Sequence, residues 1–169
     1  MRILSEKIQT LQALYLRLMR LLLSAEEMIA IKAPYLTERA TDDQLRQVLR
    51  KQTEEGEARA ARLRDMLNRA GSESAAPIKC KVIYALFDEA EELVEDAAHD
   101  AVRDAVLIAE TQRIKHYEIA VYGALRQFAR VLGCGEDERL LNETIHEESG
   151  TDKQLSTIAE RVNPAAIAA

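Results

Sequence analysis

The chain has 169 residues, of which 47% are apolar, enough for one domain with a hydrophobic core. Ala, Leu, Glu and Arg dominate while aromatic residues make up only 4%, a composition typical of long helices rather than sheets. The formal net charge is −6, with basic and acidic residues interleaved, so we expect no nucleic-acid partner. Arg17 and Arg20 interrupt the apolar run 11–25, so we expect neither a membrane span nor a signal peptide, and a cytoplasmic protein.

Five helices are predicted within a single domain that spans residues 1–169. Pro34 falls near the end of the first helix, Asp42 can cap the second, Gly71 stops it, and Pro164 is expected to close the last. The predicted helices cover about 5–33, 42–70, 78–97, 100–132 and 136–162. Four of them are long and amphipathic, so the sequence predicts an all-α four-helix bundle, with the shorter helix packed on its outside or end.

One glutamate lies within the apolar stripe of each long helix. Burying a carboxylate is costly, and converging carboxylates repel one another, so bound cations, protons or buried basic groups must neutralise them. Glutamates from four facing helices are the arrangement that di-iron and di-manganese bundles use. The pattern therefore predicts a metal site for iron or manganese, with the ligands Glu26, Glu55, Glu118 and Glu148.

Other polar side chains border these glutamates on the same helix faces. Arg59 and Lys115 are placed to pair with the carboxylates, and Gln52, Thr144 and Asp152 are further candidates to surround them. With both basic groups pointing inward, the charge at the centre falls from about −4 to about −2, which predicts single-ion or sub-stoichiometric metal occupancy. The alternative is a non-catalytic structural or interaction bundle whose glutamates are internally paired.

Two tyrosines also lie on the apolar stripes. Tyr15 falls in the first predicted helix and Tyr122 in the fourth. A hydrogen bond to a core carboxylate and simple packing are both compatible with these positions. We expect both to be plain core aromatics.

Small residues follow another side of the fourth predicted helix. This stripe contains Ala105, Ala109, His116 and Gly123. His116 points about 160° away from Glu118, so we expect it to pack against a partner rather than bind metal. The stripe needs cover that the other helices do not supply, which predicts a homodimer.

Several motifs resemble those of a known family over nearly the whole chain. They are Ala25-Glu26 followed by Pro34; Glu54-Glu55 followed by Arg62-Leu63; Ala101-Val102-Arg103-Asp104-Ala105 through His116-Tyr117-Glu118-Ile119-Ala120 and Tyr122-Gly123; and Glu147-Glu148 followed by Thr151-Asp152. With them the chain resembles the YciE/YciF family of bacterial ferritin-like proteins. The resemblance implies a ferritin-like fold, a dimer and an association with bacterial stress responses, without an established biochemical role.

The chain departs from this family beside the glutamates. Many relatives have His in place of Gln52, His or Gln in place of Arg59, and Glu in place of Lys115. The resemblance therefore implies fewer metal ligands here and two added positive charges. A third hypothesis, a di-metal oxidase or peroxidase, needs open coordination positions, and these departures argue against it; no catalytic residue is predicted.

Overall fold

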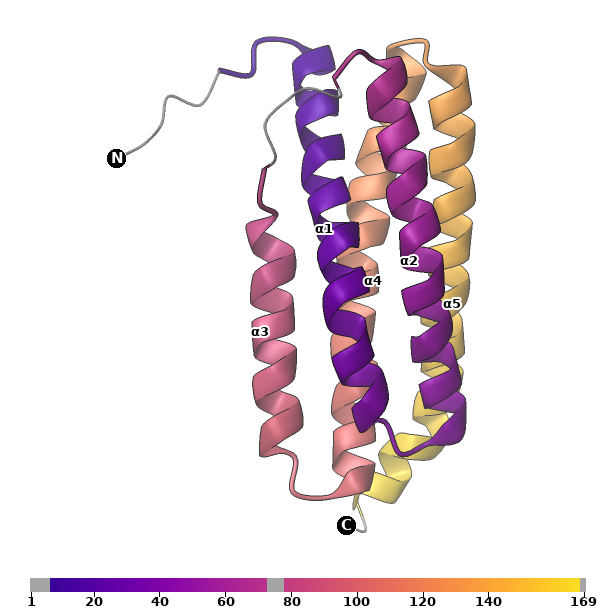
Figure 1. The fold of residues 1–169 in the computed structure, drawn as a ribbon. Coiled ribbons are helices and arrows are strands. Elements are labelled where there is room, and N and C mark those ends of the chain that lie inside the picture. The colour runs from indigo at the N-terminus through magenta and orange to yellow at the C-terminus, as the bar shows by residue number, and fades with distance from the viewer. Residues whose placement is uncertain (1–6, 73–77, 168–169) are drawn as a thin grey trace, which may run out of the picture.

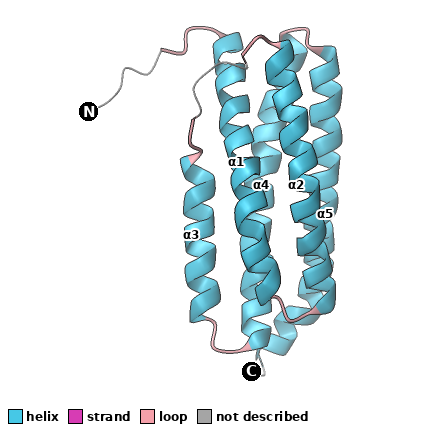
Figure 2. Cartoon of the chain, in the orientation of Figure 1, coloured by secondary structure: helices cyan, strands magenta, loops and turns pink. Residues whose placement is uncertain are grey.

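The computed structural model of the protein describes residues 7–72 and 78–167, which fold into helices joined by short loops (Figure 1). The helices are α1 Leu11–Arg39, α2 Asp43–Arg69, α3 Lys81–Asp96, α4 Asp100–Val131 and α5 Gly135–Ile167. Figure 2 shows helix and loop, and no strand, across these two ranges. The predicted all-α bundle of four long helices with one shorter helix is confirmed.

The helix directions are those of a bundle with one crossover. In Figure 1, α1 runs down and α2 runs up as one hairpin, while α4 runs up and α5 runs down as a second hairpin. Because α2 and α4 run in the same direction, the chain must return between them, and α3 makes that return along the outside of the bundle. A single long crossover of this kind is the ferritin-like arrangement of a four-helix bundle.

Three predicted helix ends were wrong by five or more residues. The first helix begins at Leu11, where the Thr10 hydroxyl accepts a hydrogen bond from the Ala13 amide, and not at residue 5, which lies outside the described residues. The first and last helices also continue past Pro34 and Pro164, to Arg39 and Ile167. Both prolines are exposed, so water can bond the carbonyl that each deprives of its donor. Leu36 and Thr37 lie beyond Pro34 and are buried, so their packing favours the continuation of the first helix.

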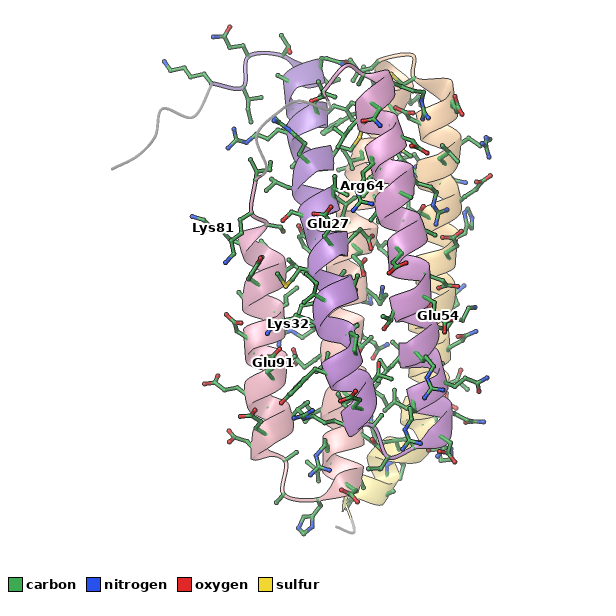
Figure 3. The ribbon with its side chains drawn as sticks, in the orientation of Figure 1. Glu27, Lys32, Glu54, Arg64, Lys81 and Glu91 are labelled. Atoms are coloured by element: carbon green, nitrogen blue, oxygen red, sulfur yellow. The ribbon has the colours of Figure 1, made fainter. Side chains whose placement is uncertain are left out.

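The shorter helix α3 packs on the outer side of α1 and α4. Its inner face is apolar and buried through Ile83, Phe87, Ala90 and Val94. Polar contacts at the edges of this face also hold α3 to the bundle. Lys32 Nζ of α1 lies 2.6 Å from Glu91 Oε1, and Figure 3 shows the two side chains meeting between the helices. The attachment therefore leaves the opposite face of α3 to solvent.

A buried aspartate holds the turn between α1 and α2. Asp104 of α4 is 3% exposed and accepts hydrogen bonds from the Thr41 amide at 2.8 Å, the Thr41 hydroxyl at 2.6 Å and the Asp42 amide at 2.8 Å. Asp42 in turn caps α2 by accepting from the Leu45 amide, and it pairs with Arg161 of α5. One side chain of α4 thus fixes the chain reversal of the other hairpin.

Replacing Asp104 with alanine should lower the free energy of unfolding by about 2–3 kcal/mol, because two backbone N–H groups in the turn lose a charged acceptor. Chemical denaturation at neutral pH measures this loss. Asp100→Ala is the matched control: Asp100 is exposed and, within residues 7–72 and 78–167, forms an ion pair only with Arg103, so its loss should be at most about 1 kcal/mol. Equal losses in the two variants would contradict the role given to Asp104.

Candidate functional site

Three of the four predicted glutamates meet at the centre of the bundle. Glu26 of α1, Glu118 of α4 and Glu148 of α5 each have an exposed fraction of 0%. Glu55 of α2 lies at the rim instead, with 31% of its side chain exposed and its Oε1 3.4 Å from Lys51 Nζ. The expectation of four glutamates in one buried cluster was therefore wrong for Glu55. Lys51, one turn earlier, gives Glu55 an ion-pair partner at the surface.

Arg59 of α2 lies among these carboxylates and is itself fully buried. Its Nε donates to Glu26 Oε2 at 3.0 Å, and its Nη1 lies 2.8 Å from Glu148 Oε1. The same Nη1 is 3.9 Å from Glu55 Oε2. One guanidinium therefore connects the glutamates of α1 and α5, with the rim glutamate of its own helix close by.

Lys115 of α4 provides the second buried positive charge. Its Nζ lies 2.5 Å from Glu148 Oε2 and 2.6 Å from Glu118 Oε2, and its exposed fraction is 1%. Only the contact with Glu148 has the geometry of a hydrogen bond, because neither carboxylate oxygen of Glu118 accepts one from the described residues. Glu118 is thus the carboxylate with the poorest compensation. We call Glu26, Arg59, Lys115, Glu118 and Glu148 the central cluster.

Both tyrosines hydrogen-bond to carboxylates, so the expectation that they are plain core aromatics was wrong. Tyr122 Oη donates to Glu26 Oε1 at 2.6 Å, within the central cluster. Tyr15 Oη donates to Asp137 Oδ2 at 2.9 Å near one end of the bundle, where Arg69 Nη2 also donates to Asp137 Oδ1 at 2.6 Å. A helical wheel places a tyrosine on the core face but does not show where its hydroxyl ends, which depends on the neighbouring helix.

Of the three other predicted neighbours, Gln52 borders the central cluster, whereas Thr144 and Asp152 do not reach it. Gln52 is 3% exposed, and its Nε2 donates to the Thr151 hydroxyl at 2.7 Å and to Glu55 Oε2 at 3.3 Å. Thr144 is buried, but its hydroxyl donates to the Leu140 carbonyl of its own helix. Asp152 faces outward, where Gln112 and His116 contact it. The prediction did not include Thr151, although it lies one turn beyond Glu148.

Burial and charge act together on the acids of the cluster. Burial, helped by the nearby Glu26, raises the pKa of Glu118 to about 7 against the opposing effect of Lys115. The pKa of Glu148 is also raised, first by burial and then by Glu118, although Lys115 and Arg59 oppose this. Glu118 therefore binds a proton as the pH falls through about 7.

The two buried bases stay charged. Burial on its own would lower the pKa of Lys115, but Glu118 and Glu148 outweigh it and the pKa is raised. The same balance holds for Arg59, whose pKa is raised by Glu26 and Glu148 against the effect of burial. Three buried carboxylates thus face two buried cations, which leaves one negative charge for a proton to neutralise.

This arrangement fits a metal ion poorly. Arg59 and Lys115 each bridge two of the buried carboxylates with their own nitrogens, so those oxygens already have positive partners. Among residues 7–72 and 78–167, no group of three or more His, Cys, Asp or Glu side chains is arranged to hold an ion. Metal binding at Glu26, Glu55, Glu118 and Glu148 stays a prediction.

The fold and its centre define a class: an all-α, ferritin-like bundle whose buried acids are met by its own basic side chains. The chain belongs to the family described as a domain of unknown function, DUF892, whose model matches residues 10–168. It is 31% identical to Protein YciF of Escherichia coli (strain K12) over 151 residues, covering 89% of this chain and 91% of that protein. The predicted resemblance to the YciE/YciF family is confirmed.

Two solved structures are similar to this fold. The E. coli stress protein YciF superposes with a TM-score of 0.88 at 30% identity, covering 93% of this chain and 99% of that one. YcfI of Rhodopseudomonas palustris, for which a structural role is suggested, gives a TM-score of 0.86 at 33% identity, covering 92% and 98%. A lipid bilayer could not be crossed by any helix among the described residues, since none combines the necessary length with enough apolar side chains.

Proposed function

We propose that this chain is a non-catalytic structural protein of the bacterial stress response, with a core neutralised by its own ion pairs. The observation that carries the proposal is that Arg59 and Lys115 each contact two of the three buried carboxylates. The description of the E. coli relative as a stress protein and the structural role suggested for the R. palustris relative support it. In this role the central cluster serves the fold and performs no chemistry.

The cluster supplies specificity of packing. Buried ion pairs add little net stability compared with apolar residues, but an unpaired buried charge is costly, so they penalise every arrangement that separates the partners. Here each of the four long helices contributes a charged residue, namely Glu26, Arg59, Lys115 with Glu118, and Glu148. A shift of one helix by a turn, about 5 Å, would leave at least one charge alone. The cluster therefore favours one register for all four helices.

A second candidate is a metal-binding ferritin-like protein that holds iron or manganese. Its support is the convergence of glutamates from α1, α4 and α5, with Glu55 of α2 nearby. If Arg59 and Lys115 swung away, these oxygens would suit such ions. A di-metal oxidase or peroxidase would need both ions and open coordination positions besides.

Metal analysis separates the two candidates. Protein purified without chelators and incubated with Fe(II) or Mn(II) should hold well under one ion per chain, because the two bases compete for the carboxylates. Lys115→Glu replaces a competing cation with a ligand, so it should bind Mn(II) more tightly, by about tenfold or more. Lys153→Glu, which changes an exposed lysine on α5, is the control and should have no effect. Two tightly bound ions per chain in the unmodified protein would overturn the structural proposal.

We also propose that the protein is a homodimer. The small-residue stripe on α4 retains two exposed members, Ala109 and His116, and Asp152 of α5 lies 3.3 Å from the His116 ring. Small side chains let a partner backbone approach closely, which supports a helix-packing interface on this side. Sedimentation velocity at micromolar concentration should show a dimer, and a monomer alone would contradict this proposal.

A further inference from the structure

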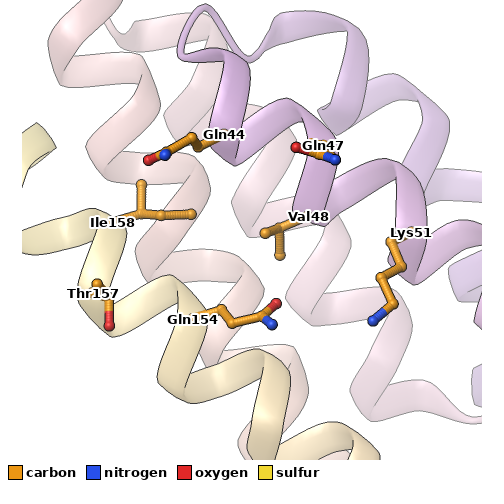
Figure 4. Close-up of a pocket in the computed structure, with 7 residues that line it drawn as sticks. All are labelled: Gln44, Gln47, Val48, Lys51, Gln154, Thr157 and Ile158. Atoms are coloured by element: carbon orange, nitrogen blue, oxygen red, sulfur yellow. The ribbon is translucent and has the colours of Figure 1, made fainter.

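A groove runs along the surface between α2 and α5 and has a volume of about 430 Å³ (Figure 4). Val48 and Ile158 give it an apolar lining, and amide side chains from both helices flank them. Lys51 is the single charged side chain among its lining residues; its Nζ lies 3.4 Å from Glu55 Oε1, and 60% of the side chain stays exposed to a partner. The groove is therefore apolar inside, with one largely exposed cation at its edge.

The outer face of α3 has the complementary character. Val82 and Leu93 are exposed there by 51% and 40%. Around Leu93 stand the exposed acids Asp88, Glu92 and Asp96, which form no ion pair with any described residue. Neighbouring acids of the same helix, in contrast, are used within the chain to fasten α3 to the bundle. This face thus offers an apolar side chain surrounded by free negative charges.

We propose that the acidic outer face of α3 in one copy of this chain docks into the α2–α5 groove of a second copy. Leu93 would lie against Val48 and Ile158, and the α3 acids would face Lys51. The lengths agree: Gln44 to Lys51 and Asp88 to Asp96 span seven and eight residue steps, about 10 and 12 Å along a helix. Charge complementarity selects this pairing over contact between two acidic faces.

The two faces lie on opposite sides of the molecule. The helix α3 packs against α1 and α4, while the groove lies between α2 and α5, across the bundle in Figure 1. One copy can therefore use both faces at once. The α3 face of a chain cannot bind the groove of the same chain. Such head-to-tail contacts propagate unless rotation closes them into a ring. This assembly deepens the structural function proposed above and rests on it.

Sedimentation velocity over a concentration series tests the assembly. A small interface implies micromolar affinity, so species larger than a dimer should grow between about 10 and about 300 µM. Lys51→Glu and Glu92→Lys should each weaken this association by about tenfold, and Lys7→Glu, outside both faces, should leave it unchanged. An equimolar mixture of Lys51→Glu and Glu92→Lys should recover association to within about threefold of the unmodified protein, because each variant complements the other.

Comparing the two charge-reversal variants, Lys51→Glu and Glu92→Lys, distinguishes local attraction between the faces from repulsion between whole molecules. Each replaces one charge by its opposite, so Lys51→Glu takes the net charge from −6 to −8 and Glu92→Lys takes it from −6 to −4. Overall repulsion alone would make the second variant associate more strongly, whereas local pairing predicts that both weaken. Absence of species beyond a dimer, or failure of the mixture to recover, overturns the proposed contact. Metal analysis is independent of these outcomes, so the structural function can fail or hold separately.

Discussion

Replacing Arg59 with methionine should lower the free energy of unfolding by about 3–5 kcal/mol, the usual loss when one partner of a buried ion pair is removed. Arg59 contacts Glu26 and Glu148, which are both fully buried, so its loss leaves two carboxylates with less compensation. Methionine keeps much of the apolar stem, so the change reports the lost charge more than a cavity. Guanidinium or urea denaturation at neutral pH gives the measurement.

The matched control is another arginine of the same helix. Arg64 Nη2 lies 2.7 Å from Glu27 Oε1 of α1, but these side chains are about half exposed, as Figure 3 shows at the surface of the α1–α2 hairpin. Arg64→Met should therefore cost no more than about 1 kcal/mol. A similar loss in both variants would show that the buried contacts of Arg59 are no more important than a surface pair.

Replacing Glu118 with glutamine should stabilise the protein above neutral pH, by at most about 3.4 kcal/mol, since the pKa is raised by about 2.5 units at about 1.36 kcal/mol each. Burial raises the pKa of Glu118 in the folded protein to about 7, from an ordinary value of 4.5. A raised acid pKa contributes stability that is fully present below about pH 4.5 and is lost as pH rises through about 7. Glutamine is neutral at every pH, so the variant lacks this loss, and its advantage over the unmodified protein should grow between pH 5 and pH 8.

Thermal denaturation of both proteins across this pH range measures the difference. Glu148→Gln provides the contrast, because Glu148 contacts both Arg59 and Lys115 and its removal leaves two cations with fewer partners. That variant should be less stable than the unmodified protein at pH 7. A Glu118→Gln variant that loses stability equally at pH 5 and pH 8 would contradict the assignment of the excess negative charge to Glu118.

The bundle could be predicted because the helical period alone identifies which residues face inward. The stripes placed Glu26, Glu118 and Glu148 on core faces, and all three are buried together. The same stripe placed Glu55 inward, yet it lies at the rim. A wheel gives only the direction of a side chain from its own helix, and Glu55 lies where α2 borders solvent beside α5. Its depth depends on helix packing, which one sequence does not reveal.

The polar partners were harder to foresee than the faces. Lys115 and Arg59 were recognised as inward bases, but the pairing of each with two particular carboxylates depends on rotamers and on the neighbouring helices. The tyrosine hydroxyls were missed for the same reason. Asp104 was recognised only within a family motif, since its three donors lie more than 60 residues earlier in the chain.

The distribution of charges between the two hairpins bears on the order of folding. The α1–α2 hairpin holds Glu26 with Arg59, and the α4–α5 hairpin holds Glu148 and Glu118 with Lys115. Within the central cluster each hairpin therefore brings its own counter-charge, and the contacts Arg59–Glu148 and Tyr122–Glu26 join the two hairpins there. Contacts within a hairpin are local in sequence and form fast, whereas docking is non-local. The two hairpins can therefore dock without desolvating a lone charge of the central cluster, which lowers the electrostatic cost of docking.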